Sequence, residues 1–253
     1  MKRFVFLAGF YILKIIRAFF SLFNEKSSCE ICSGSASFDM MVCKKCYCKF
    51  LDVKLNTENI CSVCGKNLVS EDDICLECRE NKILKSCDKV FPIFPYILWN
   101  KKLLLRWKIN GERQFSAFFA KVVYKRLCEI KEITGFFAVV PVPPRKGKMR
   151  EKGWDQISEL SRLLKYVYGM KVVSMLERVS YVQQKKLDRL ERLGTINRSY
   201  VLKKNLKEIP ERAVIIDDVL TTGATIESCS FLLKKAGVKE VYAVSIFAVS
   251  QGI

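Results

Sequence analysis

The stretch that most constrains the fold is residues 213–225, which read AVIIDDVLTTGAT. Its first residues are mostly β-branched and apolar, which predicts a buried parallel strand, and residues 226–236 have the spacing of a helix packed on one side. Two adjacent carboxylates, Asp217 and Asp218, follow the apolar run, and a short turn separates them from the helix. Because ligands bind beyond the carboxyl ends of strands in open α/β sheets, we expect a binding site here.

The turn after the two acids has the composition of an anion-binding loop. Its residues are Thr221, Thr222, Gly223, Ala224 and Thr225. The glycine allows a tight backbone whose N–H groups point inward, the three threonine hydroxyls add donors, and the next helix presents its positive end. The paired carboxylates can accept hydrogen bonds from two neighbouring hydroxyls, as on a ribose. Together these groups predict a sugar phosphate site; the alternative is an ordinary strand-to-helix turn with an acidic lip.

Eight of the twelve cysteines form an internal repeat near the N-terminus. The motif C-x2-C-x10-C-x2-C occurs twice, offset by 32 residues. A C-x2-C turn holds two sulfurs within reach of one tetrahedral ion, and two such turns complete a closed structural site. The expected zinc ligands are Cys29, Cys32, Cys43, Cys46, Cys61, Cys64, Cys75 and Cys78. The regular spacing favours two consecutive ribbons with one structural Zn²⁺ each; a cross-braced pairing of the first and third motifs is the alternative.

Four cysteines fall outside the repeat. Cys48 is close enough to the first unit to act as an alternate ligand, whereas Cys87, Cys128 and Cys229 are expected to be buried small hydrophobes. The paired motifs and the lack of a convincing secretory cleavage site favour reduced thiols, and hence a cytoplasmic location.

Composition limits the chemistry and the partners of the chain. It has no histidine, which excludes His-dependent triads and His-ligated metals. Its formal net charge of +18, from 44 basic and 26 acidic residues, favours polyanionic partners or an anionic membrane surface. The alternative is a lysine-rich chain with a solvated basic surface.

Residues 1–27 are expected to form an amphipathic N-terminal helix. Residues 1–23 are very apolar, and their only charges are Lys2, Arg3, Lys14 and Arg17. The uninterrupted apolar part is about half of the ~20 residues that a membrane-spanning helix needs. Three interpretations compete: a helix packed on the globular body, a helix lying on the inner membrane surface, and a signal-peptide core, which is the least favoured.

Strands and helices alternate in the rest of the chain. Strands are expected over residues 136–140, 171–174 and 241–249, and helices over residues 114–133 and 156–168. This alternation argues for an α/β fold with a parallel sheet. The predicted organisation is the N-terminal helix, a small cysteine-rich zinc-ribbon domain over residues 28–88, and an α/β domain over residues 89–253.

The chain resembles known families at two levels. Residues 213–225 resemble the signature of the type I phosphoribosyltransferases, which bind 5-phosphoribosyl 1-diphosphate (PRPP). From beginning to end, the chain resembles the ComF competence proteins, through the cysteine knuckles, LLLRWKINGE, VVPVPPRKGKMREKGWDQ and DDVLTTGAT. This implies a type I phosphoribosyltransferase-like domain preceded by zinc ribbons, and an association with uptake of transforming DNA. It also implies that Asp217 and Asp218 hold the ribose hydroxyls, that residues 221–225 hold the 5-phosphate, and that Mg²⁺ accompanies PRPP.

The resemblance assigns two further segments. Residues 141–145 would form a diphosphate loop surrounded by basic side chains that include Arg145 and Arg150; the alternative is a basic surface loop stiffened by prolines. Asp155 stands where the family usually has an amide, a conservative departure. Residues 178–200 lie where a mobile lid could close over the site, although Thr195 replaces an expected asparagine.

The function predicted first is a ComF-like protein that binds PRPP or a related sugar phosphate and assists DNA uptake. Its candidate partners are single-stranded DNA, the uptake machinery and the inner membrane surface. Binding is better supported than turnover, because no nucleobase pocket is recognisable. In an active enzyme, Asp217 and Asp218 would be the catalytic residues of phosphoribosyl transfer. The alternatives are a nucleotide-salvage phosphoribosyltransferase and a PRPP-sensing regulator that binds RNA.

Overall fold

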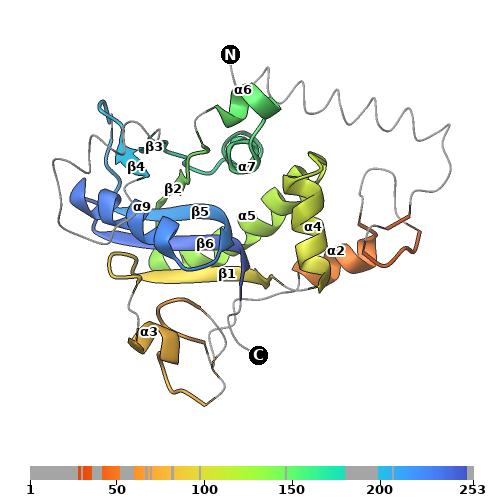
Figure 1. The fold of residues 1–253 in the computed structure, drawn as a ribbon, viewed down its shortest axis with the longest axis horizontal. Helices are drawn as coiled ribbons and strands as arrows, with labels where there is room; N and C mark the ends of the chain where they lie inside the picture. Colours follow the sequence, from red (N-terminus) through yellow and green to blue (C-terminus); the bar gives the residue numbers. More distant parts are fainter. Residues whose placement is uncertain are drawn as a thin grey trace.

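The computed structural model describes residues 28–29, 31–35, 42–51, 60–65, 68, 70–80, 83–96, 98–145, 147–179, 199–206 and 208–249 (Figure 1). The predicted N-terminal helix over residues 1–27 and the body of the predicted lid, including Thr195, lie outside these residues. None of the helices in the described part of the chain combines the length and the apolar character that a membrane crossing requires.

A parallel β-sheet forms the centre of the described structure, in the strand order β1-β6-β5-β2 (Figure 1). Its strands are β1 (Lys89–Pro95), β2 (Ala138–Pro141), β5 (Arg212–Leu220) and β6 (Glu240–Ala248). Every neighbouring pair in this sheet is parallel, and residues 213–216 at its centre are fully buried. Continuous apolar runs are typical of strands that are covered on both faces. The predicted α/β class with a parallel sheet is therefore confirmed.

Helices cover both faces of this sheet. They are α5 (Phe115–Thr134) and α7 (Gln156–Tyr166) on one face and α9 (Ala224–Lys235) on the other. Successive residues of β5 point to opposite layers, because a strand has a period of two. Val214 packs in the same core as Phe119 of α5, whereas Ile215 packs in the same core as Leu233 of α9.

One predicted strand was wrong, and a separate two-stranded sheet begins just after it. The strand expected over residues 171–174 is reduced to a single bridge between Val139 and Val172. The partner strand β2 has only four residues and ends at Pro141, so little backbone is available for pairing. Extended structure begins instead at β3 (Leu176–Arg178), which pairs antiparallel with β4 (Tyr200–Leu202).

The two cysteine units dock on different parts of the sheet domain. In the first unit, α2 (Lys44–Leu51) packs against α5, where the Tyr47 and Phe118 ring centroids lie 5.8 Å apart. In the second unit, which contains α3 (Leu76–Glu80), the Val63 carbonyl accepts a hydrogen bond of 3.0 Å from the Val90 N–H of edge strand β1. Gly65 has φ 71°, and a Cβ at this position would lie 2.4 Å from Pro92 Cδ. The second unit therefore needs glycine at the knuckle to approach the sheet.

A buried tryptophan fixes the helix that leads to the candidate site. Trp107 of α4 (Leu98–Lys108) is fully buried, and its ring centroid lies 4.6 Å from that of Phe119. Its Nε1 donates a hydrogen bond of 2.9 Å to Ser116 Oγ, so the polar edge of the ring is also satisfied. Truncating such a side chain typically costs about 3–5 kcal/mol. The next residue, Lys108, is consequently held at a defined place on α4.

Candidate ligand site and metal centres

The two acids lie side by side near the carboxyl end of β5. Sequence analysis placed them at the end of the strand, but β5 continues to Leu220. Its extension is held by β6 and the residue after it, because Leu220 N–H donates to Ser245 Oγ (2.8 Å) and the Leu220 carbonyl accepts from Val249 N–H (2.9 Å). Asp218 N–H donates to Asp217 Oδ1 over 2.8 Å, which orients the first carboxylate relative to the second.

The surroundings of Asp217 disfavour its charged form. Burial in a region of low polarity, and next the neighbouring Asp218 carboxylate, raise the pKa of Asp217 to about 7. The N–H group of Asp218 and the ammonium of Lys108 oppose this shift without cancelling it. A carboxyl group with a pKa near neutrality at the end of a parallel strand is typical of a functional position.

Lys108 is a member of the site that sequence reasoning missed. Its Nζ lies 2.6 Å from Asp218 Oδ2, in a pair whose side chains are 37% and 14% exposed. The Lys108 carbonyl accepts a hydrogen bond of 3.1 Å from Gln156 Nε2, at the first residue of α7. The available signal was indirect: Lys108 lies within LLLRWKINGE, a segment that carries the family resemblance without an assigned role.

The predicted anion-binding turn follows β5 directly. Thr221 and Thr222 are exposed, and Gly223, at φ 84°, is the N-cap of α9. Because this N-cap has no side chain, it offers no capping acceptor to the first N–H groups of the helix, and the Ala224 N–H donates a long hydrogen bond of 3.4 Å to Thr222 Oγ1. The expected five-residue turn is shorter than predicted, because Ala224 and Thr225 already belong to the first turn of α9. Their N–H groups lie at the positive end of this twelve-residue helix.

The hairpin of β3 and β4 borders the helix end. Tyr200 of β4 interacts with the Thr225 side chain, and the Arg178 guanidinium lies 5.5 Å from the Tyr200 ring centroid. Burial raises the pKa of Tyr200 to about 12, so its hydroxyl remains protonated at neutral pH and can act as a donor.

A linker that follows the second cysteine unit packs against this same end of α9. In this linker, residues 83–88, the side chain of Leu84 covers Gly223 so closely that a Cβ on the glycine would lie 3.2 Å from Leu84 Cδ2. Glu227, which is 7% exposed, accepts hydrogen bonds from Lys85 N–H (2.8 Å), Ser86 N–H (2.9 Å) and Ser86 Oγ (2.8 Å). The linker therefore ties the second cysteine unit to the turn and to α9.

The basic residues predicted to surround a diphosphate lie on and before α6 (Lys148–Lys152). Arg145 pairs with Glu151, and Arg150 is exposed, so their role in ligand binding stays a prediction. The structure instead brings Lys148 into the polar network of α7, with Nζ 2.6 Å from Asp155 Oδ2. Asp155 accepts a hydrogen bond from Ser158 N–H (2.8 Å) as the N-cap of α7, which gives a physical reason for aspartate at this departure from the family pattern.

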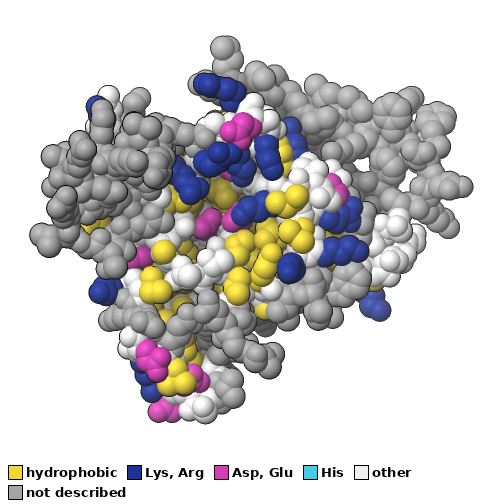
Figure 2. All heavy atoms as spheres, viewed as in Figure 1, with side chains coloured by type: hydrophobic (Ala, Val, Ile, Leu, Met, Phe, Trp, Pro, Cys, Tyr) yellow, Lys and Arg dark blue, Asp and Glu magenta, His cyan; other side chains and the backbone are white. Residues whose placement is uncertain are grey.

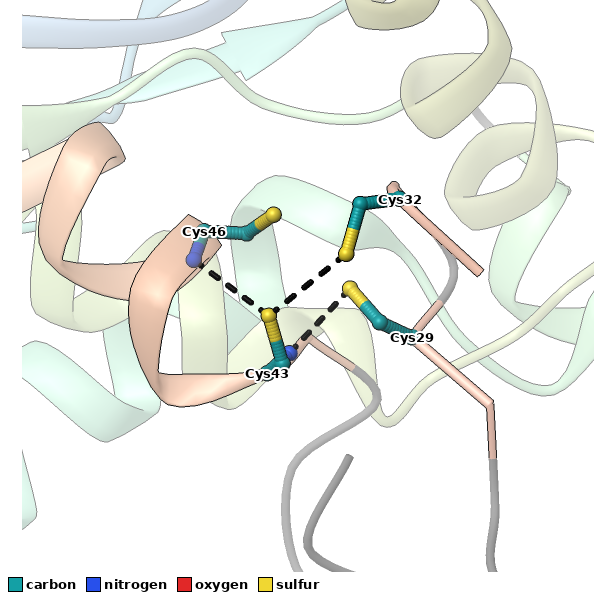
Figure 3. A group of neighbouring side chains, drawn as sticks. All are labelled: Cys29, Cys32, Cys43 and Cys46. Atoms are coloured by element: carbon teal, nitrogen blue, oxygen red, sulfur yellow. Dashed lines mark hydrogen bonds between the residues drawn. The ribbon is translucent and has the colours of Figure 1, made fainter. Parts of the chain in front are cut away.

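The eight repeat cysteines form two separate four-sulfur clusters. One consists of Cys29, Cys32, Cys43 and Cys46, drawn in Figure 3, and the other of Cys61, Cys64, Cys75 and Cys78. The ligand atoms of each cluster lie within 4.8 Å of one another. The predicted consecutive pairing is confirmed, and the cross-braced alternative is wrong.

The geometry of both clusters fits zinc. Four sulfurs about 2.3 Å from a tetrahedral ion lie roughly 3.8 Å from one another. The Sγ atoms of Cys32 and Cys43 lie 3.7 Å apart, and those of Cys64 and Cys75 also lie 3.7 Å apart. Burial opposes ionisation of Cys61, but N–H groups directed at its sulfur outweigh this effect and lower its pKa to about 7, which favours the thiolate that a metal binds.

The other cysteines are not brought into these clusters. Cys48 is exposed and is not a member of either group. Cys87 and Cys229 are buried as expected, and Cys128 is half-buried. Closed four-sulfur sites have no open position for a substrate, so these clusters can support folding and docking.

Known proteins resemble the chain along most of its length. It is 29% identical over 210 residues to "Competence protein ComFC" of Streptococcus pneumoniae, covering 82% of this chain and 88% of that protein. It is 26% identical over 219 residues to "Competence protein F" of Haemophilus influenzae, covering 84% of this chain and 93% of that protein. The chain is a homologue of these two competence proteins. No protein-family model matches it. The cysteine clusters agree with the zinc ribbons that the family resemblance implies.

Proposed function

We propose that the chain binds PRPP or a related sugar phosphate at the end of β5 and acts in natural competence. The main support for the ligand proposal is that one short turn joins the two acids to the N-terminus of a helix. Asp217 and Asp218 lie on β5, and three residues, Thr221 to Gly223, separate that strand from α9. Acceptors for sugar hydroxyls and donors for a phosphate therefore occupy one strand–turn–helix unit.

The chemistry of each part supports a phosphorylated ribose. The carboxylates would accept hydrogen bonds from the 2- and 3-hydroxyls, and the N–H groups of residues 221–225 would donate to the 5-phosphate. Carboxylate oxygens are also ligands that Mg²⁺ prefers, so Asp217 and Asp218 suit a ligand that carries this ion. Mg²⁺ bound with the diphosphate would neutralise part of its negative charge.

The proposed role in DNA uptake rests on the relatives and on charge. The relatives are named competence proteins, and the chain carries a formal net charge of +18. Figure 2 shows Lys and Arg side chains gathered over the region where Figure 1 places α4, α6 and α7. Such a surface suits single-stranded DNA, and its binding must weaken as salt rises, because phosphate contacts release counterions. The two four-cysteine clusters support a cytoplasmic location, where thiols stay reduced and available to a metal ion.

Calorimetric titration with PRPP and Mg²⁺ tests the ligand proposal. We expect the unaltered protein to bind and the double variant Asp217→Asn with Asp218→Asn to lose binding while it keeps its circular dichroism spectrum. Glu211→Gln is the matched control, because it removes an exposed carboxylate that pairs with Lys239. No binding by the unaltered protein, or equal binding by the double variant, would contradict the proposal.

Two further measurements separate the competing functions. Diphosphate release from PRPP with an added nucleobase would identify a salvage enzyme, and preference for structured RNA over single-stranded DNA would identify an RNA-binding regulator. Normal transformation of a strain that lacks the protein would contradict the role in competence.

A further inference from the structure

Lys108 places a positive charge inside the candidate site on a backbone that is fixed on both sides. Trp107 anchors the preceding position by its complete burial. The Lys108 carbonyl accepts from Gln156 Nε2 over 3.1 Å, which ties the end of α4 to the start of α7. The ammonium itself is less confined, since the side chain is 37% exposed and pairs with Asp218 Oδ2 at 2.6 Å. The backbone is thus preorganised, while the charged end can move.

The two faces of the sheet show from which side Lys108 approaches Asp218. The turn at residues 221–223 leads into α9, which covers one face of the sheet, whereas Lys108 is tied to α7 on the opposite face. Lys108 therefore reaches Asp218 from the side away from the anion-binding turn. A 5-phosphate and a substituent at C1 extend from opposite ends of a ribose. With the 5-phosphate on the turn, the C1 substituent points away from it, towards the α7 side.

We propose that Lys108 binds the anionic group at C1 of the sugar, and that its ammonium transfers from Asp218 to the diphosphate when PRPP enters. The inference rests on the proposed sugar phosphate site. Before binding, Lys108 compensates the charge of Asp218; afterwards the sugar hydroxyls occupy that carboxylate and the diphosphate receives the ammonium. A lysine suits this exchange, because it is a compact charge on a flexible stem with three rotatable donors. Lys108 would thereby favour a diphosphorylated sugar over a simple sugar phosphate.

The test compares two ligands that differ at C1. PRPP and ribose 5-phosphate are titrated, each with Mg²⁺, into the unaltered protein, Lys108→Met and Lys108→Arg. We expect Lys108→Met to weaken PRPP binding by roughly 10- to 100-fold, the loss of one hydrogen bond between charged groups, and to change ribose 5-phosphate binding less than about twofold. Lys108→Arg should retain most of the PRPP affinity. Lys171→Met is the matched control, because it removes another partly exposed lysine, which pairs with Glu208.

Each outcome decides between the inference and an alternative. If Lys108→Met weakens the binding of both ligands equally, Lys108 only positions Asp218. If neither affinity changes, Lys108 has no role in binding. Either result overturns the inference. If the unaltered protein binds neither ligand, the proposed function itself fails. If Lys108→Met melts at a lower temperature than the unaltered protein, the deciding quantity is the ratio of the PRPP affinity to the ribose 5-phosphate affinity in Lys108→Arg. A ratio close to that of the unaltered protein supports the inference, and a ratio near one overturns it.

Discussion

Replacing Glu227 by glutamine should loosen the contact between the linker and α9 and destabilise the protein. The carboxylate is 7% exposed and accepts hydrogen bonds of 2.8 to 2.9 Å from two backbone N–H groups and one hydroxyl of the linker. A hydrogen bond to a charged group contributes roughly 1.5–3 kcal/mol, and an unpaired buried donor costs about 1–3 kcal/mol. A glutamine keeps one acceptor oxygen but sets its NH₂ group against donors, so we expect Glu227→Gln to cost about 2–4 kcal/mol.

Thermal unfolding provides the assay. For a chain of this size, the expected cost lowers the melting temperature by roughly 4–16 °C. Glu211→Gln is the control: its side chain is 57% exposed and pairs with Lys239 over 3.1 Å, a type of interaction worth about 0–1 kcal/mol. Because Leu84 of the same linker covers Gly223, Glu227→Gln should also weaken sugar phosphate binding, whereas Glu211→Gln should not. Equal melting temperatures for the two variants would show that the hydrogen bonds of Glu227 to the linker do not stabilise the fold.

Three other perturbations have defined outcomes. Cys61→Ser with Cys64→Ser should remove one of two zinc equivalents, measured by elemental analysis, and an unchanged zinc content would refute the assignment. Burial raises the pKa of Asp217 to about 7, so its protonated form stabilises the fold below the unfolded pKa of about 3.9, and this contribution disappears as the pH rises through 7. The ionised form accepts sugar hydroxyls, so PRPP affinity should rise by up to about tenfold between pH 6 and 8; a rise of equal size in Asp217→Asn would contradict this cause. Gly65→Ala places a Cβ 2.4 Å from Pro92 Cδ at φ 71°, so it should lower the melting temperature, and an unchanged transition would show that the knuckle does not need glycine.

Local sequence patterns predicted the elements that depend on local physics. The apolar run at residues 213–216 predicted a buried parallel strand, because a strand that is covered on both faces has no polar side. The cysteine repeat predicted two clusters with the correct membership, because a C-x2-C turn brings its own two sulfurs together. The carboxylates and the turn lie on one continuous strand–turn–helix unit, so their proximity followed from the chain itself.

Contacts between distant segments could not be predicted in the same way. Lys108 reaches Asp218 only because Trp107 is buried and Gln156 holds the end of α4, and no local pattern encodes this arrangement. The bond between Lys85 N–H and Glu227 joins residues 142 positions apart. Both contacts are consequences of packing, and both determine how the candidate site is built.

Hydrogen–deuterium exchange with and without PRPP and Mg²⁺ is the sharpest test of the proposed sugar phosphate pocket. We expect PRPP to slow amide exchange at residues 221–225, where the backbone N–H groups would hold the 5-phosphate, and we expect the slowing to be lost when Asp217 and Asp218 are replaced by asparagine. Unchanged exchange in this turn at saturating PRPP would contradict a single pocket built from the two acids and the start of α9.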